Sequence, residues 1–114
     1  MNPLRQKMAL FLTDAARKGL KSLDPKSQCA KILRKSDFEN ILREDVNRIC
    51  EATSFIEITK TISLTAQLQR ASEEKRKAIK DELKKIAEDV VKRIEKKSGK
   101  LKMPKPCRHL LLNL

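Results

Sequence analysis

Three cysteines and a single histidine are the residues best suited to bind a metal ion or to act in nucleophilic catalysis. Zn²⁺ is commonly held by three thiolates and one imidazole, which are available here from Cys29, Cys50, Cys107 and His109. Their spacing matches no familiar zinc module, and Cys29 and Cys50 lie in apolar helical patterns, where cysteine acts as a small hydrophobic residue. The pair Cys107 and His109 lacks an orienting carboxylate. We therefore expect no metal site and no cofactor.

Paired acidic residues are the other potential catalytic feature, and they are best explained as surface charges. The three pairs are Glu73-Glu74, Asp81-Glu82 and Glu88-Asp89. They lie among lysines at the i,i+4 spacing that stabilises an exposed helix. With only two glycines in the chain, no glycine-rich phosphate loop can be formed. We expect a protein that is not an enzyme.

A large positive charge is the strongest signal in the sequence. Lys and Arg number 27 against 15 Asp and Glu, which gives a net charge of +12. Such an excess favours a polyanionic partner, which is nucleic acid, an anionic membrane or an acidic protein. The charge is uneven: residues 1–35 hold nine bases and two acids, residues 36–71 hold four and six, and residues 98–114 hold four and none.

The predicted phosphate-binding residues are the bases that have almost no acidic neighbours in the sequence. They are Arg17, Lys18, Lys21, Lys26, Lys31, Arg34, Lys35, Lys100, Lys102, Lys105 and Arg108. These side chains form one basic surface if the first two helices lie beside the C-terminal tail. A helix-turn-helix is disfavoured because Asp37 and Glu39 would repel phosphate. The three phenylalanines lie on apolar helical stripes, which leaves no aromatic stacking platform. We expect contacts to the phosphate backbone of DNA or RNA with little sequence specificity.

The C-terminal sequence CRHLLLNL contains four leucines, and it has three interpretations. Packing onto the protein's own core is favoured, since exposed leucines promote aggregation. The second is a docking peptide or an arm exchanged in a homodimer, and the third is metal binding. The predicted partner-binding residues are Leu110, Leu111, Leu112 and Leu114. The alternative function is a protein–protein adaptor or assembly subunit that associates through the last helix and this tail. Attachment to a membrane through the basic first helix ranks third.

Composition and helix signals predict an all-α domain that positions these residues. Strand-rich folds need more glycine and aromatic residues than this chain has. Helix starts are expected at Asn2-Pro3, at Asp24-Pro25, and at two capping boxes that begin at Ser36 and Ser54. Gly19 is the expected end of the first helix. The apolar stripe of the last helix consists of Ile79, Leu83, Ile86, Val90 and Ile94. We predict a four- to five-helix bundle over residues 1–99, followed by a basic, proline-containing linker and tail over residues 100–114.

The cysteine count and the hydropathy pattern also bear on location. Three cysteines without close pairing favour reduced thiols and a cytoplasmic protein. No apolar run approaches the length of a membrane span. The run MALFL near the N-terminus is too short for a secretion signal, and Asp14 closes it.

Overall fold

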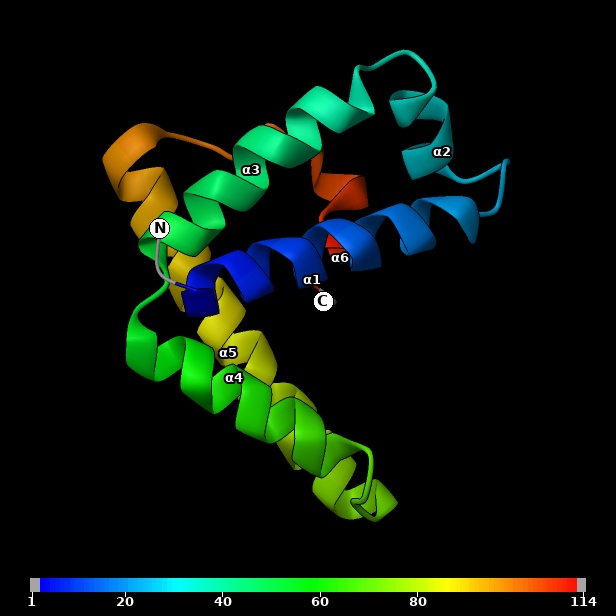
Figure 1. The fold of residues 1–114 in the computed structure, drawn as a ribbon. Helices are drawn as coiled ribbons and strands as arrows, with labels where there is room; N and C mark the ends of the chain where they lie inside the picture. Colours follow the sequence, from blue (N-terminus) through cyan, green and yellow to red (C-terminus); the bar gives the residue numbers. More distant parts are fainter. Residues whose placement is uncertain (1–2, 113–114) are drawn as a thin grey trace.

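The computed structural model describes residues 3–112, which form six α-helices and one 3₁₀ turn without any strand (Figure 1). In chain order the elements are α1 (Pro3–Lys21), α2 (Gln28–Leu33), α3 (Phe38–Ala52), α4 (Phe55–Leu68), α5 (Glu73–Ser98), η1 (Lys105–Cys107) and α6 (His109–Leu112). The prediction of an all-α fold is confirmed. The predicted bundle of four or five helices is met only in part, because the chain beyond residue 99 adds η1 and α6. Asn2 and Leu114 lie outside the described residues.

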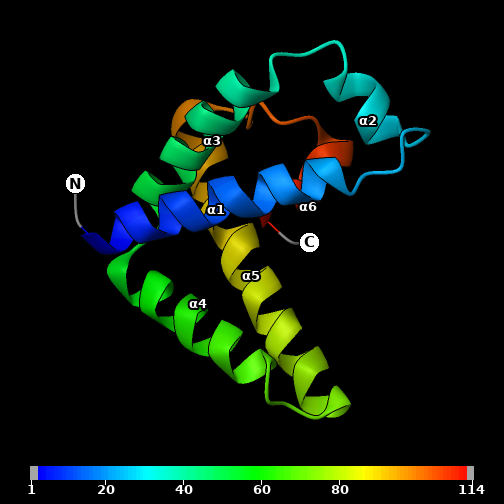
Figure 2. The ribbon, with the colours of Figure 1, turned by 45° about the vertical axis from the view of Figure 1, so that its right-hand side comes forward.

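The helices divide into a body and a projecting hairpin. In the body, α1 packs on α3 and on α6, while α2 closes one end and packs on η1 (Figure 1). The hairpin of α4 and α5 extends away from the body, and the C-terminal part of α5 packs against α3 (Figures 1 and 2). The loop at residues 69–72 separates α4 from α5, so the two do not form one continuous helix.

The main core lies where α1, α3, α5 and the tail meet. Its buried side chains include Leu42, Val46 and Ile49 from α3, with Val90 and Ile94 from α5. The same core contains tail residues on the far side of the predicted boundary at residue 99: Leu101, Met103, Cys107, Leu110 and Leu111. Linker and tail are therefore packed into the body. Within the hairpin, α4 and α5 bury Ile58, Leu64 and Ile79.

The predicted end of the first helix at Gly19 is wrong, because α1 continues to Lys21. Gly19 instead allows α6 to approach closely. A β-carbon placed on Gly19 would lie 2.7 Å from Cδ2 of Leu110, which is closer than van der Waals contact permits. The structural reason for a glycine at position 19 is therefore a packing contact with a residue 91 positions later.

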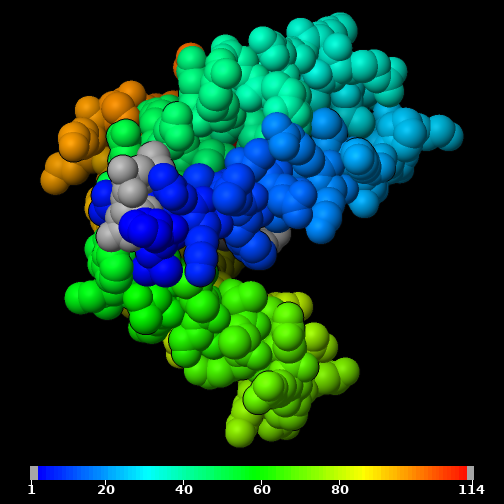
Figure 3. Space-filling view, viewed as in Figure 1, coloured from blue at the N-terminus to red at the C-terminus, as the bar shows by residue number. Residues whose placement is uncertain are grey.

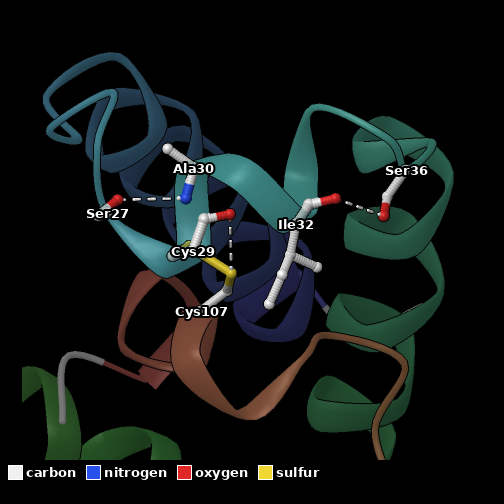
Figure 4. Close-up of a disulfide and its surroundings, with 6 residues drawn as sticks. All are labelled: Ser27, Cys29, Ala30, Ile32, Ser36 and Cys107. Atoms are coloured by element: carbon white, nitrogen blue, oxygen red, sulfur yellow. Dashed lines mark hydrogen bonds between the residues drawn. A yellow bond between two sulfur atoms is a disulfide. The ribbon is translucent and has the colours of Figure 1, made fainter.

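The starts of α2 and α3 differ from the predicted ones by one to three residues. Ser27, and not Asp24, caps α2 by accepting a hydrogen bond from the backbone N–H of Ala30 at 3.2 Å (Figure 4). The predicted capping box at Ser36 does not form. Asp37 accepts the N–H of Asn40 in its place, at 3.3 Å, and the Ser36 hydroxyl donates to the carbonyl of Ile32 at 3.0 Å.

The start of α4 agrees with the sequence signal, and a glycine ends α5. Ser54 and Glu57 form the predicted capping box, in which the Ser54 hydroxyl accepts the Glu57 N–H and the Glu57 carboxylate accepts the Ser54 N–H. Gly99 ends α5 with φ of +86°, a conformation that favours glycine. The β-branched segment 55–65 is helical, because its capping box and its packing against α5 outweigh its local strand preference.

Candidate nucleic-acid interface

The linker that carries part of the basic charge is held by a buried carboxylate on α3. The Asp45 side chain is fully buried. Its Oδ1 accepts the backbone N–H of Lys102 at 2.9 Å, and its Oδ2 accepts that of Met103 at 2.7 Å. Two donors on one carboxylate satisfy both its oxygens and offset the unfavourable burial of its charge. This contact fixes the direction in which the chain leaves α5.

One helical turn further along α3, the Arg48 guanidinium makes further contacts with the chain that follows α5. It lies 3.7 Å from the Asp45 carboxylate and donates to three backbone carbonyls, which belong to Ser98, Gly99 and Lys100. Helix ends leave such carbonyls without partners, so Arg48 satisfies the C-terminal end of α5. Together the two side chains bind residues 98–103 to α3.

A disulfide then joins the tail to α2. Cys29 and Cys107 are bonded across a sequence separation of 78 residues, with their Cα atoms 5.1 Å apart (Figure 4). That Cα separation lies within the usual range for disulfides. Both cysteines are buried. The prediction of three reduced thiols is therefore wrong for this pair, and only Cys50 is free among the described residues.

The four predicted zinc-ligand candidates do not assemble in residues 3–112, where no group of three potential ligands is found. The disulfide uses two of the sulfur atoms. Cys50 is buried in the main core, and burial raises the pKa of its thiol. A buried thiol with a raised pKa is a poor nucleophile and a poor metal ligand.

The leucines of the tail pack into the protein's own core. Leu110 and Leu111 are buried, and Leu112 is half-buried against the same cluster. In this conformation Leu110 and Leu111 are not exposed to a partner. Of the three interpretations of the tail, the structure shows packing onto the body.

Five of the predicted phosphate-binding residues already have partners in the described structure. Arg17 makes two hydrogen bonds to Glu39, at 3.0 and 2.8 Å, and the pKa of Glu39 is lowered by them. The other four partnered bases form the pairs Lys18 with Asp14, Lys102 with Glu44, Arg108 with Glu95, and Arg34 with the carbonyl of Pro25. Arg34 is the only one of these whose partner is uncharged. Lys100 lies at the opposite end of the linker from α2, beside Arg48.

Arg34 and five further predicted bases lie on the end of α1, on α2 and in the loops beside it, and on η1. We name this region the basic corner and define it by six exposed side chains: Lys21, Lys26, Lys31, Arg34, Lys35 and Lys105. None of them has an ion pair within residues 3–112. The packing of η1 on α2 and the Cys29–Cys107 disulfide bring Lys105 to the elements that carry the others. Tail and N-terminal helices are therefore neighbours, as the basic-surface hypothesis requires.

Acidic residues are scarce at the basic corner. Within residues 21–36 the only acid is Asp24, whose Oδ1 accepts the backbone N–H of Lys26 at 2.9 Å. The exposed face of α5 is different, because seven acids alternate there with ten bases over residues 72–97. Interspersed charges of opposite sign largely cancel at distances greater than their own spacing, and salt screens what remains. The basic corner therefore has the higher local density of uncompensated positive charge.

The features that sequence reasoning missed depend on contacts between distant segments. Asp45 interrupts the apolar stripe of α3 and gave no local sign that it binds the linker.

Phe11 and Phe55 lie on apolar stripes, yet their exposed fractions are 56% and 52%, so the prediction that all three phenylalanines enter the core is wrong for these two. Phe11 lines a second feature, an apolar groove between α1 and α4.

Comparison with known protein families, curated proteins and solved structures finds no match to this chain. Over residues 3–112, none of the helices combines the length and the apolar character needed to cross a bilayer.

Proposed function

We propose that this protein is a non-catalytic accessory or architectural protein that binds the phosphate backbone of nucleic acid through the basic corner. The observation that carries the proposal is the packing of η1 on α2, with the Cys29–Cys107 disulfide, which brings Lys105 to the bases on and beside α2. Asp24 is the only acid within residues 21–36. Phosphate contacts of this kind supply affinity and orientation but little sequence information.

The chemistry of the surface favours backbone contacts over base recognition. No phenylalanine lies on α2 or η1, so the basic corner has no aromatic platform on which to stack unpaired bases. α2 has six residues, too few to span a major groove as a recognition helix. Lysine ammonium groups on short elements act as mobile point charges for phosphate.

Salt dependence is the measurement that tests the proposal. The full chain is titrated into two fluorescent duplexes of unrelated sequence, each of about 20 base pairs. The binding constant is measured at several NaCl concentrations between about 50 and 200 mM. If four to six phosphates are neutralised, we expect a log–log slope of about −4 to −5, nearly the same for both sequences. Absence of binding at the lowest salt concentration would overturn the proposal.

A pair of charge-matched variants distinguishes the basic corner from the general positive charge. The triple substitution Lys26→Gln, Lys31→Gln and Lys35→Gln is compared with Lys77→Gln, Lys80→Gln and Lys84→Gln on α5. Both variants lose three charges. We expect the first to reduce the salt slope by about three and the second to leave it nearly unchanged. Equal loss in both variants would mean that no particular surface is used.

The alternative proposal is an adaptor that associates through the last helix and the tail. Burial of Leu110 and Leu111 in the core gives this segment little exposed apolar surface, so the observations favour nucleic acid. The cytoplasmic location stays a prediction, and the Cys29–Cys107 disulfide weighs against it, because disulfides persist mainly in oxidising compartments.

A further inference from the structure

An apolar groove lies between α1 and α4, away from the basic corner. It has a volume of about 350 Å³, and its lining is almost entirely apolar. The lining residues are Lys7, Met8, Phe11, Ile58, Thr61, Ile62 and Thr65. The groove lies on the side where α1 and the α4–α5 hairpin diverge (Figure 2), and the space-filling view shows a hollow there between the body and the hairpin (Figure 3).

Two large side chains on opposite walls of the groove are half exposed. Phe11 on α1 has an exposed fraction of 56%, and Ile62 on α4 has one of 52%, while Ile58 between them is buried. Aromatic and branched aliphatic side chains that face each other across an open groove are typical of a protein-binding site. An enclosed small-molecule pocket would bury most of its ligand and its own lining, and this groove is too open for that.

The charges on the two helices identify the kind of partner. Both acids of α1 and α4 are already neutralised, since Asp14 pairs with Lys18 at 3.1 Å and Glu57 pairs with Arg93. Lys7 lines the groove and is exposed. It has no ion pair within residues 3–112. The lining is thus apolar apart from one uncompensated positive charge and two threonine hydroxyls, and neither helix carries a free acid.

The length of the groove fits an α-helix. Its wall on α4 runs from Ile58 to Thr65, which corresponds to two helical turns, or about 10 Å. A helix that docks in such a groove presents apolar anchors at positions i, i+3 or i+4, and i+7. A second copy of this chain is a poor occupant, because each copy carries a charge of +12 and like charges oppose association.

We infer that the α1–α4 groove binds an acidic amphipathic helix of a partner protein, whose apolar anchors pack between Phe11 and Ile62 and whose carboxylates face Lys7. This interaction uses a surface separate from the basic corner. The nucleic-acid proposal is therefore tested independently, by its own experiment.

The probe is a synthetic peptide of about 15 residues, long enough to populate a helix, with leucines at positions i, i+4 and i+7 and glutamates on its other face. Two control peptides are the same sequence with lysine for glutamate, and a scrambled sequence of the same composition. Binding to the ¹⁵N-labelled full chain is followed by fluorescence anisotropy and by amide chemical shifts. We expect saturable binding of the acidic peptide, with shifts centred on α1 and α4.

The decisive comparison is between two isoleucines on α4. Ile62→Gln changes the groove, whereas Ile56→Gln changes a residue that is 80% exposed and does not line it. We expect Ile62→Gln to weaken the acidic peptide about tenfold and Ile56→Gln to have no effect. Because Ile62 is half exposed, the variant keeps its fold, which circular dichroism verifies.

Four outcomes would overturn the inference. They are the absence of binding, equal binding of the lysine or scrambled peptide, chemical shifts confined to the basic corner, and equal effects of the two substitutions. Sedimentation velocity adds a fifth test. Concentration-dependent dimerisation that is abolished by Ile62→Gln would assign the groove to a second copy instead.

Discussion

Oδ2 of Asp45 on α3 accepts the backbone N–H of Met103 at 2.7 Å, 58 residues away along the chain. Both groups are buried, and the other carboxylate oxygen is occupied by the N–H of Lys102. The linker therefore follows a single path along α3 into the core. Because η1 comes after the linker, the position of Lys105 in the basic corner depends on this contact.

Asp45→Asn should destabilise the protein. An amide can accept only one of the two N–H groups and places its own donor against the other, so a buried donor loses its partner. We expect the free energy of unfolding to fall by about 2–4 kcal/mol and the Met103 amide to exchange faster. Urea unfolding and hydrogen exchange measure these effects.

The control for this substitution is the adjacent residue Glu44, whose carboxylate pairs with the exposed side chain of Lys102. Glu44→Gln should change the free energy of unfolding by about 0–1 kcal/mol. If Asp45→Asn were as stable as Glu44→Gln, the proposed role of Asp45 would be wrong.

Loss of the disulfide should loosen the tail. A cross-link between residues so far apart in the sequence restricts the unfolded chain strongly, so reduction or Cys107→Ser should lower the free energy of unfolding by about 2–4 kcal/mol. Trypsin should then cleave faster after Arg108, whereas Pro106 protects the bond that follows Lys105. A thiol assay on the denatured, unreduced protein should detect one free thiol per chain, that of Cys50. Detection of three thiols would contradict the structure.

Gly19→Ala should destabilise the protein when residue 110 is leucine and stabilise it when residue 110 is alanine. In the native chain the new β-carbon meets Cδ2 of Leu110, and we expect destabilisation of about 1 kcal/mol. In a Leu110→Ala background the contact is absent, and alanine should stabilise α1 by about 0.5–1 kcal/mol through its higher helix propensity. Thermal unfolding of the four proteins gives the double-mutant cycle. Identical effects in both backgrounds would exclude the close approach.

The Glu57–Arg93 pair should make stability depend on pH. Arg93 donates hydrogen bonds to the Glu57 carboxylate, one of them at 2.7 Å, and lowers the pKa of Glu57 from 4.5 to about 2. Because the folded-state pKa is the lower one, the pair stabilises the protein above pH 4.5 and loses this effect as the pH falls towards 2. Glu57→Gln should remove about 1–2 kcal/mol at pH 7 and much less at pH 2.

The matched control for this pair is Glu88→Gln on the exposed face of α5. Its effect should be close to zero at both pH values. Urea midpoints at pH 7 and pH 2 provide the comparison. A Glu57→Gln effect that did not decrease with falling pH would contradict the proposed role of the ion pair.

Local signals in the sequence were sufficient for most helices and failed where two signals competed. Ser54 and Glu57 form the expected capping box, because the neighbouring Thr53 ends α3 and donates its hydroxyl to the carbonyl of Ile49. At Ser36 the neighbouring Asp37 is an equally good cap, and Glu39, the other half of the predicted box, is bound by Arg17 instead. The choice between Ser36 and Asp37 was settled by packing against α1, which no window of the sequence contains.

Contacts between distant segments limit what the sequence predicts about the candidate site. The bases of α2 were recognised from their charge alone. Arg17, Lys18 and Lys102 do not belong to the basic corner because each forms an ion pair with an acid on another turn or another helix. Likewise, three cysteines allow three pairings, and only the packing of η1 on α2 selects Cys29 with Cys107.

The bond between Cys29 and Cys107 turns most of the polypeptide into a covalent ring. The ring contains α3, α4 and α5, and only α1 and α6, with the residues beside them, lie outside it. A protease that cuts once in the exposed loop between α4 and α5 would therefore leave a nicked molecule whose two pieces remain attached. The helices outside the ring would then stay with the basic corner even after the hairpin is opened.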